Sequence, residues 1–404
     1  MVKRYYGGLI SATPTTVNSS SASGLFNPTQ QMQAKRAGNW PSPPPAYYLW
    51  GWGYNGYGQI GDNTTTNKSS PVQIGADTTW SSIDAGGPSV LAVKQNGTMW
   101  SWGRNNNANL GLGDTYNRSS PTQVGALTTW SKVSAGASHC AAIKTDGTLW
   151  TWGDNLYNGH LGLGDTINRS NPTQVGTDAN WLQVSAGGYG SAAIKTDGTL
   201  WAWGNNFYGS LGQGDTTPRS TPVQIGARTA WSQVSAGIQM CAAIDTDNYL
   251  WTWGFASSTK LGLGDNDQVH KSSPTQVGSQ TWSKVSTTVL AHSTMAIRTN
   301  GTLWGWGSNS YGQLGLNDTS TRSSPVQVGA LTTWSSVSLG NFNSHGITTT
   351  GELWSWGRNG YGRLGLGEAG NSAPQSKSSP VQVGTDATWL SIAAGRYAAS
   401  ALKA

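Results

Sequence analysis

The phrase Leu-Trp-x-Trp-Gly, in which Met99 once replaces the Leu, occurs seven times and constrains the fold more than any other feature of the sequence. The first Trp residues of successive copies are 50, 50, 51, 50, 53 and 50 positions apart, and another Trp follows each pair after 30 to 35 positions. A period near 50 residues that is rich in Gly and aromatic residues is typical of β-propeller blades. We expect the Trp pairs to form the structural core of the blades: Trp50, Trp52, Trp100, Trp102, Trp150, Trp152, Trp201, Trp203, Trp251, Trp253, Trp304, Trp306, Trp354 and Trp356.

The local pattern within each repeat predicts antiparallel hairpins. Residues 140–153, CAAIKTDGTLWTWG, contain two strand-like runs joined at Asp146-Gly147, a strong signal for a type I′ hairpin turn. The two Trp residues of a pair share one strand face because side chains alternate along a strand. The residue between them is small, so one face of each blade is bulky and the other is shallow. Stacked blades can therefore fill the space between them.

The two ends of the repeat array predict how the ring closes. The first repeat begins directly at its Trp strand, residues 47–53, and the last run, residues 399–404, stops where the next hairpin turn would begin. We expect this last run to pair with residues 48–53, which would complete the seventh blade and remove two open sheet edges. The sequence thus predicts an all-β fold, a seven-bladed β-propeller closed by its N- and C-terminal strands and preceded by an extended N-terminal arm.

A longer motif surrounds each Trp pair. It reads G-x-N-x-x-G-x-L-G-x-G-D and then R-S-S-P-x-Q-V-G, for example GRNNNANLGLGDTYNRSSPTQVG at residues 103–125. Over residues 47–404 this unit resembles the repeat of the regulator of chromosome condensation (RCC1-like) family. The resemblance implies a seven-bladed propeller. The best-known member of that family is a guanine-nucleotide exchange factor that binds chromatin, but the propeller also serves in many interaction proteins, so the fold does not assign an activity.

The positive charge of the chain is concentrated before the repeats. Of 24 basic and 18 acidic residues, residues 1–45 hold four basic ones, Lys3, Arg4, Lys35 and Arg36, and no acidic one. The repeat region is nearly neutral, which argues against a nucleic-acid partner. There is no apolar run long enough to span a bilayer and no secretion signal, so we expect no membrane insertion.

The leader itself does not repeat. Residues 7–41, GGLISATPTTVNSSSASGLFNPTQQMQAKRAGNWP, resemble N-terminal segments of virion proteins of marine bacteriophages. Asn27 followed by Pro28 is typical of a helix start, and Gly38 can end the helix, so we expect a short helix over about residues 28–37. We interpret residues 1–40 as a docking arm, residues 41–46 as a Pro-rich linker and residues 47–404 as the propeller.

The resemblance implies that the arm docks to other virion proteins. The charged, aromatic and apolar residues expected to make this contact are Lys3, Arg4, Tyr5, Tyr6, Leu25, Phe26, Met32, Lys35, Arg36 and Trp40. The alternative is that the leader packs against its own propeller.

Each repeat also places an acidic residue a few positions before a basic one. The pairs are Asp62/Lys68, Asp114/Arg118, Asp165/Arg169, Asp215/Arg219, Asp265/Lys271, Asp318/Arg322 and Glu368/Lys377. They could form a charged ring for an anionic partner, or each pair could stabilise its own loop by a charge-assisted hydrogen bond. Their presence in every repeat favours the structural role.

The remaining reactive side chains do not indicate catalysis. His139, His292 and His345 lie at different offsets from the following Ile, which excludes a metal ring in register. Cys140 and Cys241 belong to repeats two apart, too distant for a disulfide. We therefore expect no enzyme activity, no metal and no cofactor.

Three segments break the regularity of the repeats and are candidate binding loops. They are GFASSTKLGLGDNDQVHKSSP at residues 254–274, STTVLAHSTM at 286–295 and GEAGNSAPQSKSSP at 367–380. Partner-binding loops and random drift of loop sequences explain these irregularities about equally well. The candidate binding residues are Lys260, His270, His292, Glu368, Asn371, Gln375 and Lys377.

Two functional hypotheses follow from the sequence. The first is a non-enzymatic phage virion structural protein, of the tail, fibre or capsid-decoration type, present in several copies and assembled in the host cytoplasm. Its arm would dock to the particle and its propeller would be displayed, with a host surface receptor or glycan as a possible ligand. The alternative is a cellular RCC1-like protein-interaction module or small-GTPase regulator.

Overall fold

The structure is a computed structural model that describes residues 45–404, except 157, 258–259, 265–268, 289–291 and 369–374, together with 17–18 and 21–22. The chain divides into two compact units, Met1–Ala46 and Tyr47–Ala404. In the first unit, β1 (Val17–Asn18) and β2 (Ser21–Ala22) form an antiparallel pair. The expected helix over residues 28–37 and all ten expected docking residues lie outside the described residues.

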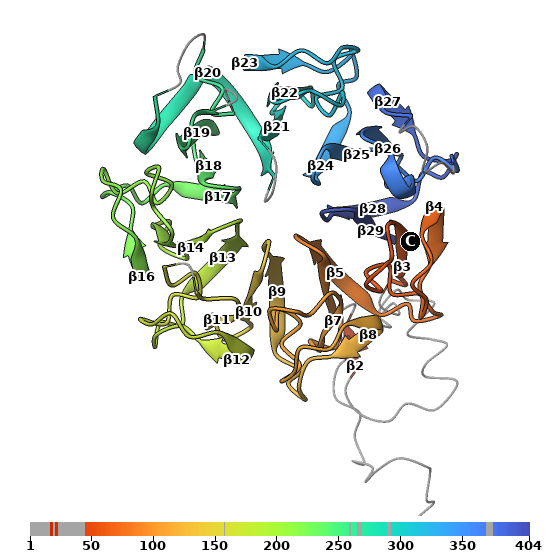
Figure 1. Cartoon of the computed structure of the whole chain (residues 1–404), viewed down its shortest axis with the longest axis horizontal. Coiled ribbons are helices and arrows are strands. Elements are labelled where there is room, and N and C mark those ends of the chain that lie inside the picture. Colours follow the sequence, from red (N-terminus) through yellow and green to blue (C-terminus); the bar gives the residue numbers. More distant parts are fainter. Residues whose placement is uncertain are drawn as a thin grey trace, which may run out of the picture. The chain divides into compact units, whose positions relative to one another are not determined.

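The second unit is a many-bladed β-propeller, in which sheets are arranged around a ring (Figure 1). Six innermost strands begin at the third Trp of a repeat: β5 (Trp80–Ala85), β9 (Trp130–Ala135), β13 (Trp181–Ala186), β17 (Trp231–Ala236), β24 (Trp334–Leu339) and β28 (Trp389–Ala394). The second strands are β6 (Ser89–Lys94), β10 (His139–Lys144), β14 (Gly190–Lys195), β18 (Met240–Asp245), β21 (Ser293–Arg298), β25 (Asn343–Thr348) and β29 (Ala398–Lys403). The third strands carry the Trp pairs: β3 (Tyr48–Gly53), β7 (Met99–Gly103), β11 (Leu149–Gly153), β15 (Leu200–Gly204), β19 (Tyr249–Gly254), β22 (Leu303–Gly307) and β26 (Leu353–Gly357).

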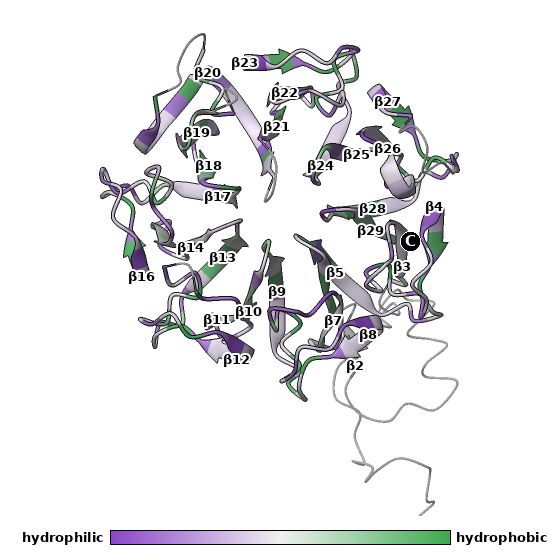
Figure 2. Ribbon diagram, viewed as in Figure 1, coloured by the Kyte–Doolittle hydropathy of each residue, from purple (hydrophilic) through white to green (hydrophobic). Residues whose placement is uncertain are grey.

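The outermost strands are the most polar. They are β4 (Lys68–Gln73), β8 (Arg118–Gln123), β12 (Arg169–Gln174), β16 (Arg219–Gln224), β23 (Arg322–Gln327) and β27 (Lys377–Gln382). Hydrophilic residues are visible along these strands in Figure 2. One 3₁₀ turn, η2 (Gly360–Gly362), lies in the loop after β26. Among the described residues, no helix is long and apolar enough to cross a membrane.

Within each sheet the strands pair in chain order. Four sheets have four consecutive strands: β5-β6-β7-β8, β9-β10-β11-β12, β13-β14-β15-β16 and β24-β25-β26-β27. A fifth four-stranded sheet, β28-β29-β3-β4, joins the two ends of the repeat array. In it, β29 pairs antiparallel with β3, from Ala398 opposite Gly53 to Lys403 opposite Tyr48.

One long strand departs from the repeat pattern. The strand β20 (Lys271–Thr287) pairs with β19 through its first half and with β21 through its second half, so that seven strands, β17 to β23, form one sheet. Gln276 is six positions before Trp282, whereas the corresponding Gln and Trp are seven positions apart in the other repeats, for example Gln123 and Trp130. The shorter connection gives a continuous strand where the other repeats have a short turn.

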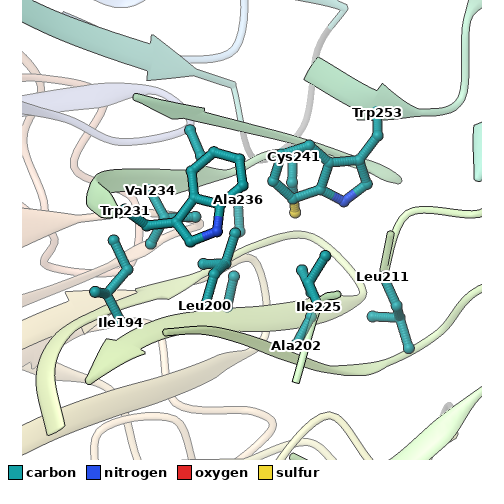
Figure 3. Close-up of a cluster of buried hydrophobic side chains, with 12 residues drawn as sticks. Ile194, Leu200, Ala202, Leu211, Ile225, Trp231, Val234, Ala236, Cys241 and Trp253 are labelled. Atoms are coloured by element: carbon teal, nitrogen blue, oxygen red, sulfur yellow. The ribbon is translucent and has the colours of Figure 1, made fainter. Parts of the chain in front are cut away.

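The core lies between neighbouring sheets. Figure 3 shows one such cluster, in which Trp231 and Trp253 of one sheet face Ile194, Leu200 and other apolar residues of the preceding sheet. The second Trp of every pair is completely buried: Trp52, Trp102, Trp152, Trp203, Trp253, Trp306 and Trp356. The first Trp of every pair is partly buried and packs against one of these core clusters, as Trp251 does against the cluster of Figure 3.

The second Trp also links one repeat to the previous one by a hydrogen bond. For example, Trp203 Nε1 donates to the carbonyl oxygen of His160 at 2.8 Å. The same bond occurs in all seven repeats, and Trp52 donates to Arg363 O at 3.1 Å across the meeting point of the chain ends. Gly162 is required beside this contact, because its φ is +73° and a Cβ would lie 2.9 Å from Trp203 Nε1.

Within the part of the chain that the structure describes, a Lys or Arg side chain lies over the ring of the first Trp in six of the seven pairs, all but that of Trp354. Lys94 Nζ lies 3.7 Å from the Trp100 ring centroid, and Lys144 Nζ lies 3.6 Å from that of Trp150. Such cation–π contacts shield a partly exposed ring while the charge remains near water.

The loop ion pairs expected from the sequence are present. Six of the seven pairs are observed, for example Arg118 with Asp114 at 2.5 Å and Lys377 with Glu368 at 2.8 Å. The seventh acid, Asp265, lies outside the described residues. Each observed pair joins residues of one loop, which confirms the structural interpretation of these charges.

Candidate binding face

Three loop positions carry different residues in different repeats, although their backbones make the same hydrogen bonds in each. One position is the residue directly after the strand that holds the Trp pair. Another is the residue directly before the second strand of the sheet. Their backbones are hydrogen-bonded to each other, as in Arg104 N to Pro88 O at 3.0 Å and Arg358 N to Phe342 O at 2.8 Å. The third is the position whose carbonyl accepts the bond from the buried Trp. We call the loops that carry these three positions the variable face.

The third position was not singled out in the sequence. Its occupants are all buried and all polar: Gln59, Asn109, His160, Ser210, Lys260, Gln313 and Arg363. Their backbone carbonyls accept the same bond in every repeat, whereas their side chains make different local hydrogen bonds, for example Gln59 Oε1 accepting from Tyr57 N and Asn109 Nδ2 donating to Arg104 O. Aligning the seven repeats against one another would have revealed this position, because it lies directly before the regular Leu-Gly or Ile-Gly pair.

One part of the variable face is rich in Arg and Tyr. The guanidinium of Arg104 lies 4.9 Å from the Tyr57 ring centroid, and that of Arg358 lies 4.9 Å from Tyr311. We call this group the Arg–Tyr cluster. Its members are Arg104, Arg358, Arg363, Arg396, Tyr54, Tyr57, Tyr311, Tyr361 and Tyr397.

Tyr54 is at the centre of this cluster. Its ring centroid lies 5.9 Å from Tyr57, 5.0 Å from Tyr361 and 5.8 Å from Tyr397. Burial and the neighbouring tyrosines raise the pKa of Tyr54, so its hydroxyl stays protonated near neutral pH. Tyr361 is 42% exposed and presents an aromatic surface at the edge of the cluster.

The four arginines of the cluster form no ion pair with any of the described residues. Nε of Arg104, Arg358 and Arg396 and Nη1 of Arg363 are buried and make no hydrogen bond within the described structure. Burial and the nearby Arg358 lower the pKa of Arg363 to about 10, which still leaves it charged at neutral pH. The cluster therefore retains donors and positive charge that the fold itself does not use.

A hollow of about 260 Å³ adjoins this cluster, and we call it the central hollow. It is lined by loops that follow the innermost strands β5, β9, β13, β17 and β28, which surround the middle of the ring in Figure 1, and by the loops after the Trp strands β7 and β11. The side chains that give it chemical character are Arg104, Arg396, Asn106, Asn107, Asp154 and Tyr189.

The candidate loop after β19 carries Lys260, which is completely buried. Its Nζ donates to Ile238 O at 2.8 Å and lies 3.2 Å from His292 Nδ1. Burial lowers the pKa of Lys260 to about 7, while burial and this lysine lower the pKa of His292 to about 4. The lysine is thus enclosed because its loop closes on the neighbouring repeat.

His270 replaces a framework contact in the same loop. In three other repeats an Asn side chain accepts the equivalent bond from the loop backbone, as when Asn117 Oδ1 accepts from the backbone N of Asn105 at 2.8 Å. Ala256 occupies the position of Asn105 here, and its backbone N donates to His270 Nδ1 at 3.2 Å. His270 also contacts the rings of Tyr208 and Phe255, with centroid distances of 5.0 and 4.9 Å.

The last candidate loop contributes mainly structural contacts. Glu368 pairs with Lys377 at 2.8 Å and accepts a hydrogen bond from Asn359 Nδ2 at 3.3 Å. Gln375 is exposed, and Asn371 lies outside the described residues. The structure therefore does not bring these residues together with Lys260, His270 and His292 through any contact that it records.

The buried His and Cys residues have packing roles. His139 Nε2 lies 2.8 Å from Ser191 Oγ, but both side chains are almost completely buried, so this pair has no access for a substrate. Cys140 and Cys241 are free and buried, and burial raises the pKa of the Cys241 thiol to about 12. Among the described residues, no group of three or more metal-ligating side chains is found.

Comparison with known families and structures agrees with this architecture. The model for the regulator of chromosome condensation (RCC1) repeat matches residues 48–93, 96–143, 146–194, 197–244, 300–345 and 350–402. These matches cover more than half of the chain, so the chain belongs to the RCC1 repeat family. Residues 245–299, which include Lys260, His270 and His292, fall between the matches. Comparison with curated protein sequences gives no significant match.

Solved structures share the fold at low sequence identity. Human WBSCR16 is 20% identical with a TM-score of 0.77 and covers 88% of this chain and 100% of its own. Prp20p from Saccharomyces cerevisiae is 18% identical with a TM-score of 0.77, covering 89% and 92% of the two chains. Yeast RCC1 (Prp20), in a structure with bound Kap60, is 18% identical with a TM-score of 0.78, covering 100% and 96%. These likenesses establish an RCC1-like propeller fold.

Proposed function

We propose that this chain is a non-enzymatic, RCC1-like protein-interaction module that binds its partner through the variable face. The observation that supports it best is the Arg–Tyr cluster. The regular charges of the repeats are paired within their own loops, whereas the four arginines of the cluster have no acidic partner among the described residues. Arg and Tyr are enriched where protein interfaces concentrate their binding energy.

The relatives support a role in binding proteins. Prp20p is described with binding to Gsp1p and histones, and yeast RCC1 with bound Kap60. A partner for this chain would be complementary to the Arg–Tyr cluster and hence acidic and partly aromatic or apolar. A small-GTPase regulator is a special case of this function, in which the bound partner also releases its nucleotide faster.

Copurification from the cells that encode the chain tests this function. Arg358→Glu should abolish retention of the partner because it reverses one charge of the cluster, and a reversed rim charge repels an acidic partner. Lys284→Glu is the matched control, since Lys284 is exposed on β20 and outside the cluster. Partner retention by Arg358→Glu together with its loss by Lys284→Glu would contradict the assignment. Accelerated nucleotide release from a copurified GTPase would identify the regulator.

We further infer that the ring has seven blades. In this interpretation the sheet β17 to β23 is two blades that share β20, and the pairing of β29 with β3 closes the ring. The family resemblance and the seven Trp pairs support this count.

The virion role stays a prediction. It depends on residues 7–41, whose resemblance to virion-protein segments is not returned by any of the comparisons. The docking residues from Lys3 to Trp40 lie outside the described residues, so no contact in the structure bears on particle docking.

A further inference from the structure

We propose that the central hollow binds a carboxylate-bearing sugar unit, such as a uronic acid residue of an acidic glycan. The inference goes beyond the protein-interaction role, because it concerns a small-ligand site that can be filled or empty without a protein partner. It follows from the charge, the polar groups, the aromatic wall and the size of the hollow.

The charge of the hollow suits a ligand with a single negative group. Arg104 and Arg396 line it, and neither forms an ion pair with the described residues. Asp154 is the acidic residue in the lining, so the three side chains together carry one net positive charge. A planar guanidinium can bind a carboxylate through two parallel hydrogen bonds, which are stronger than bonds between neutral groups.

Both guanidinium groups are held in place before a ligand binds. Arg104 is fixed by its backbone bond to Pro88 O at 3.0 Å and by the Tyr57 ring at 4.9 Å. Arg396 N donates to Gly87 O at 2.9 Å, and its guanidinium lies 4.9 Å from the Tyr397 ring centroid. A site whose charged groups are already ordered loses less side-chain entropy on binding.

The other lining groups match the hydroxyls and the apolar face of a sugar ring. Asn106 and Asn107 are exposed amides that can both donate and accept. Asp154 Oδ1 accepts from Leu156 N at 3.1 Å, which leaves acceptor capacity on its carboxylate for a sugar hydroxyl. Tyr189 is 38% exposed at the wall and offers an aromatic surface for the C–H face of the ring.

The size of the hollow favours one sugar unit over an extended ligand. Sites for drug-sized ligands enclose roughly 300–1,000 Å³, and the central hollow encloses about 260 Å³. An acidic peptide or a polyphosphate would bring several negative charges against Asp154. A sugar with one carboxylate can instead use Asp154 as a hydrogen-bond acceptor.

Titration calorimetry of the full chain with tetragalacturonate tests the site. Neutral galactotetraose and the methyl ester of tetragalacturonate are the ligand controls, and they do not depend on any protein variant being folded. Arg104→Gln and Arg396→Gln should each weaken tetragalacturonate binding by about tenfold or more, because each loses a charge-assisted bond. Lys284→Gln, which removes one charge elsewhere, should leave the affinity unchanged within about twofold.

Asp154→Asn separates a sugar from a simple anion. A sugar that uses the carboxylate as an acceptor should bind Asp154→Asn more weakly, whereas hexaglutamate should bind it more tightly because the repulsion is gone. Equal binding of the neutral and acidic tetrasaccharides would overturn the proposal, as would unchanged affinity in folded Arg104→Gln and Arg396→Gln. Tighter binding of hexaglutamate than of tetragalacturonate would assign the hollow to an acidic peptide instead.

Discussion

Ala401→Pro should lower the stability of the propeller by more than about 3 kcal/mol and broaden or abolish its cooperative unfolding. Ala401 is completely buried in the middle of β29, between Ile392 of β28 and Trp50 of β3. A proline in a central strand removes a ladder hydrogen bond and disturbs both neighbouring strands. Denaturant unfolding followed by Trp fluorescence measures the effect.

Two controls separate ring closure from ordinary strand damage. Ala142→Pro makes the same change at the matching position of β10, where Ala142 lies opposite Trp150 and is equally buried. In that sheet a short hairpin links β10 to its neighbour β11. The strands β29 and β3 instead come from opposite ends of the repeat array, so detachment of β29 opens a very long loop. Ser400→Ala should be neutral or slightly stabilising, since the buried Ser400 Oγ makes no recorded hydrogen bond. Equal damage by Ala142→Pro and Ala401→Pro would contradict a special role for closure.

Asp245→Lys should destabilise the chain by roughly 3–5 kcal/mol, the cost of breaking a buried ion pair from one side. Asp245 is completely buried and pairs with Arg228 at 2.5 Å, while Trp251 Nε1 donates to it at 2.9 Å. The substitution would place a second cation beside Arg228. Thermal and denaturant unfolding of the single variant measure the loss.

The other repeats provide the rescue for this variant. At the same spacing three of them have the opposite order of charges, for example Asp178 before Lys195 at 2.7 Å and Asp386 before Lys403 at 2.6 Å. The double variant Arg228→Asp/Asp245→Lys reproduces that order and should recover most of the lost stability. A double variant no more stable than Asp245→Lys would show that Asp245 acts through its hydrogen bonds to Trp251 and the backbone instead of its charge.

Much of the framework was predictable because it depends on short-range patterns. The hairpin at Asp146-Gly147, the Trp strands and the loop pair Arg118–Asp114 each involve residues close together in sequence. The expected type I′ turn of that hairpin is wrong, because Gly147 has a positive φ and Asp146 does not, whereas type I′ needs it at both residues. The continuous strand β20 was not predicted. Its cause, one residue fewer between Gln276 and Trp282, is visible in the sequence, but its consequence depends on how two neighbouring sheets meet.

The binding face was less predictable because its residues come from distant repeats. Tyr54 meets Tyr361 and Tyr397 only after the ends of the array come together, so no local pattern indicates the Arg–Tyr cluster. The irregular loop at residues 254–274 was recognised as unusual, but Lys260 is buried since its side chain reaches Ile238 of the neighbouring loop. Irregular loop length identified where the repeats differ, and comparison of equivalent positions identifies where they present different chemistry.

Both proposed roles use the variable face, and Arg104 and Arg396 belong to the Arg–Tyr cluster as well as to the lining of the central hollow. Arg358 and Tyr361 lie in the loop after β26, outside the lining of the central hollow, whereas Arg104 and Arg396 line it. Loss of the copurified partner in Arg358→Glu therefore tests the protein-interaction role. Weaker tetragalacturonate binding in Arg396→Gln tests the sugar site in the hollow. The two proposals can fail independently.

The most direct measurement is hydrogen–deuterium exchange of the full chain with and without its copurified partner. If the variable face is the binding surface, protection should concentrate at residues 54–57, 104–109, 358–363 and 395–397, with little change along the outermost strands β8, β12 and β16. Protection confined to those outer strands, or to the loops that hold the paired charges at residues 114–118 and 165–169, would contradict the account.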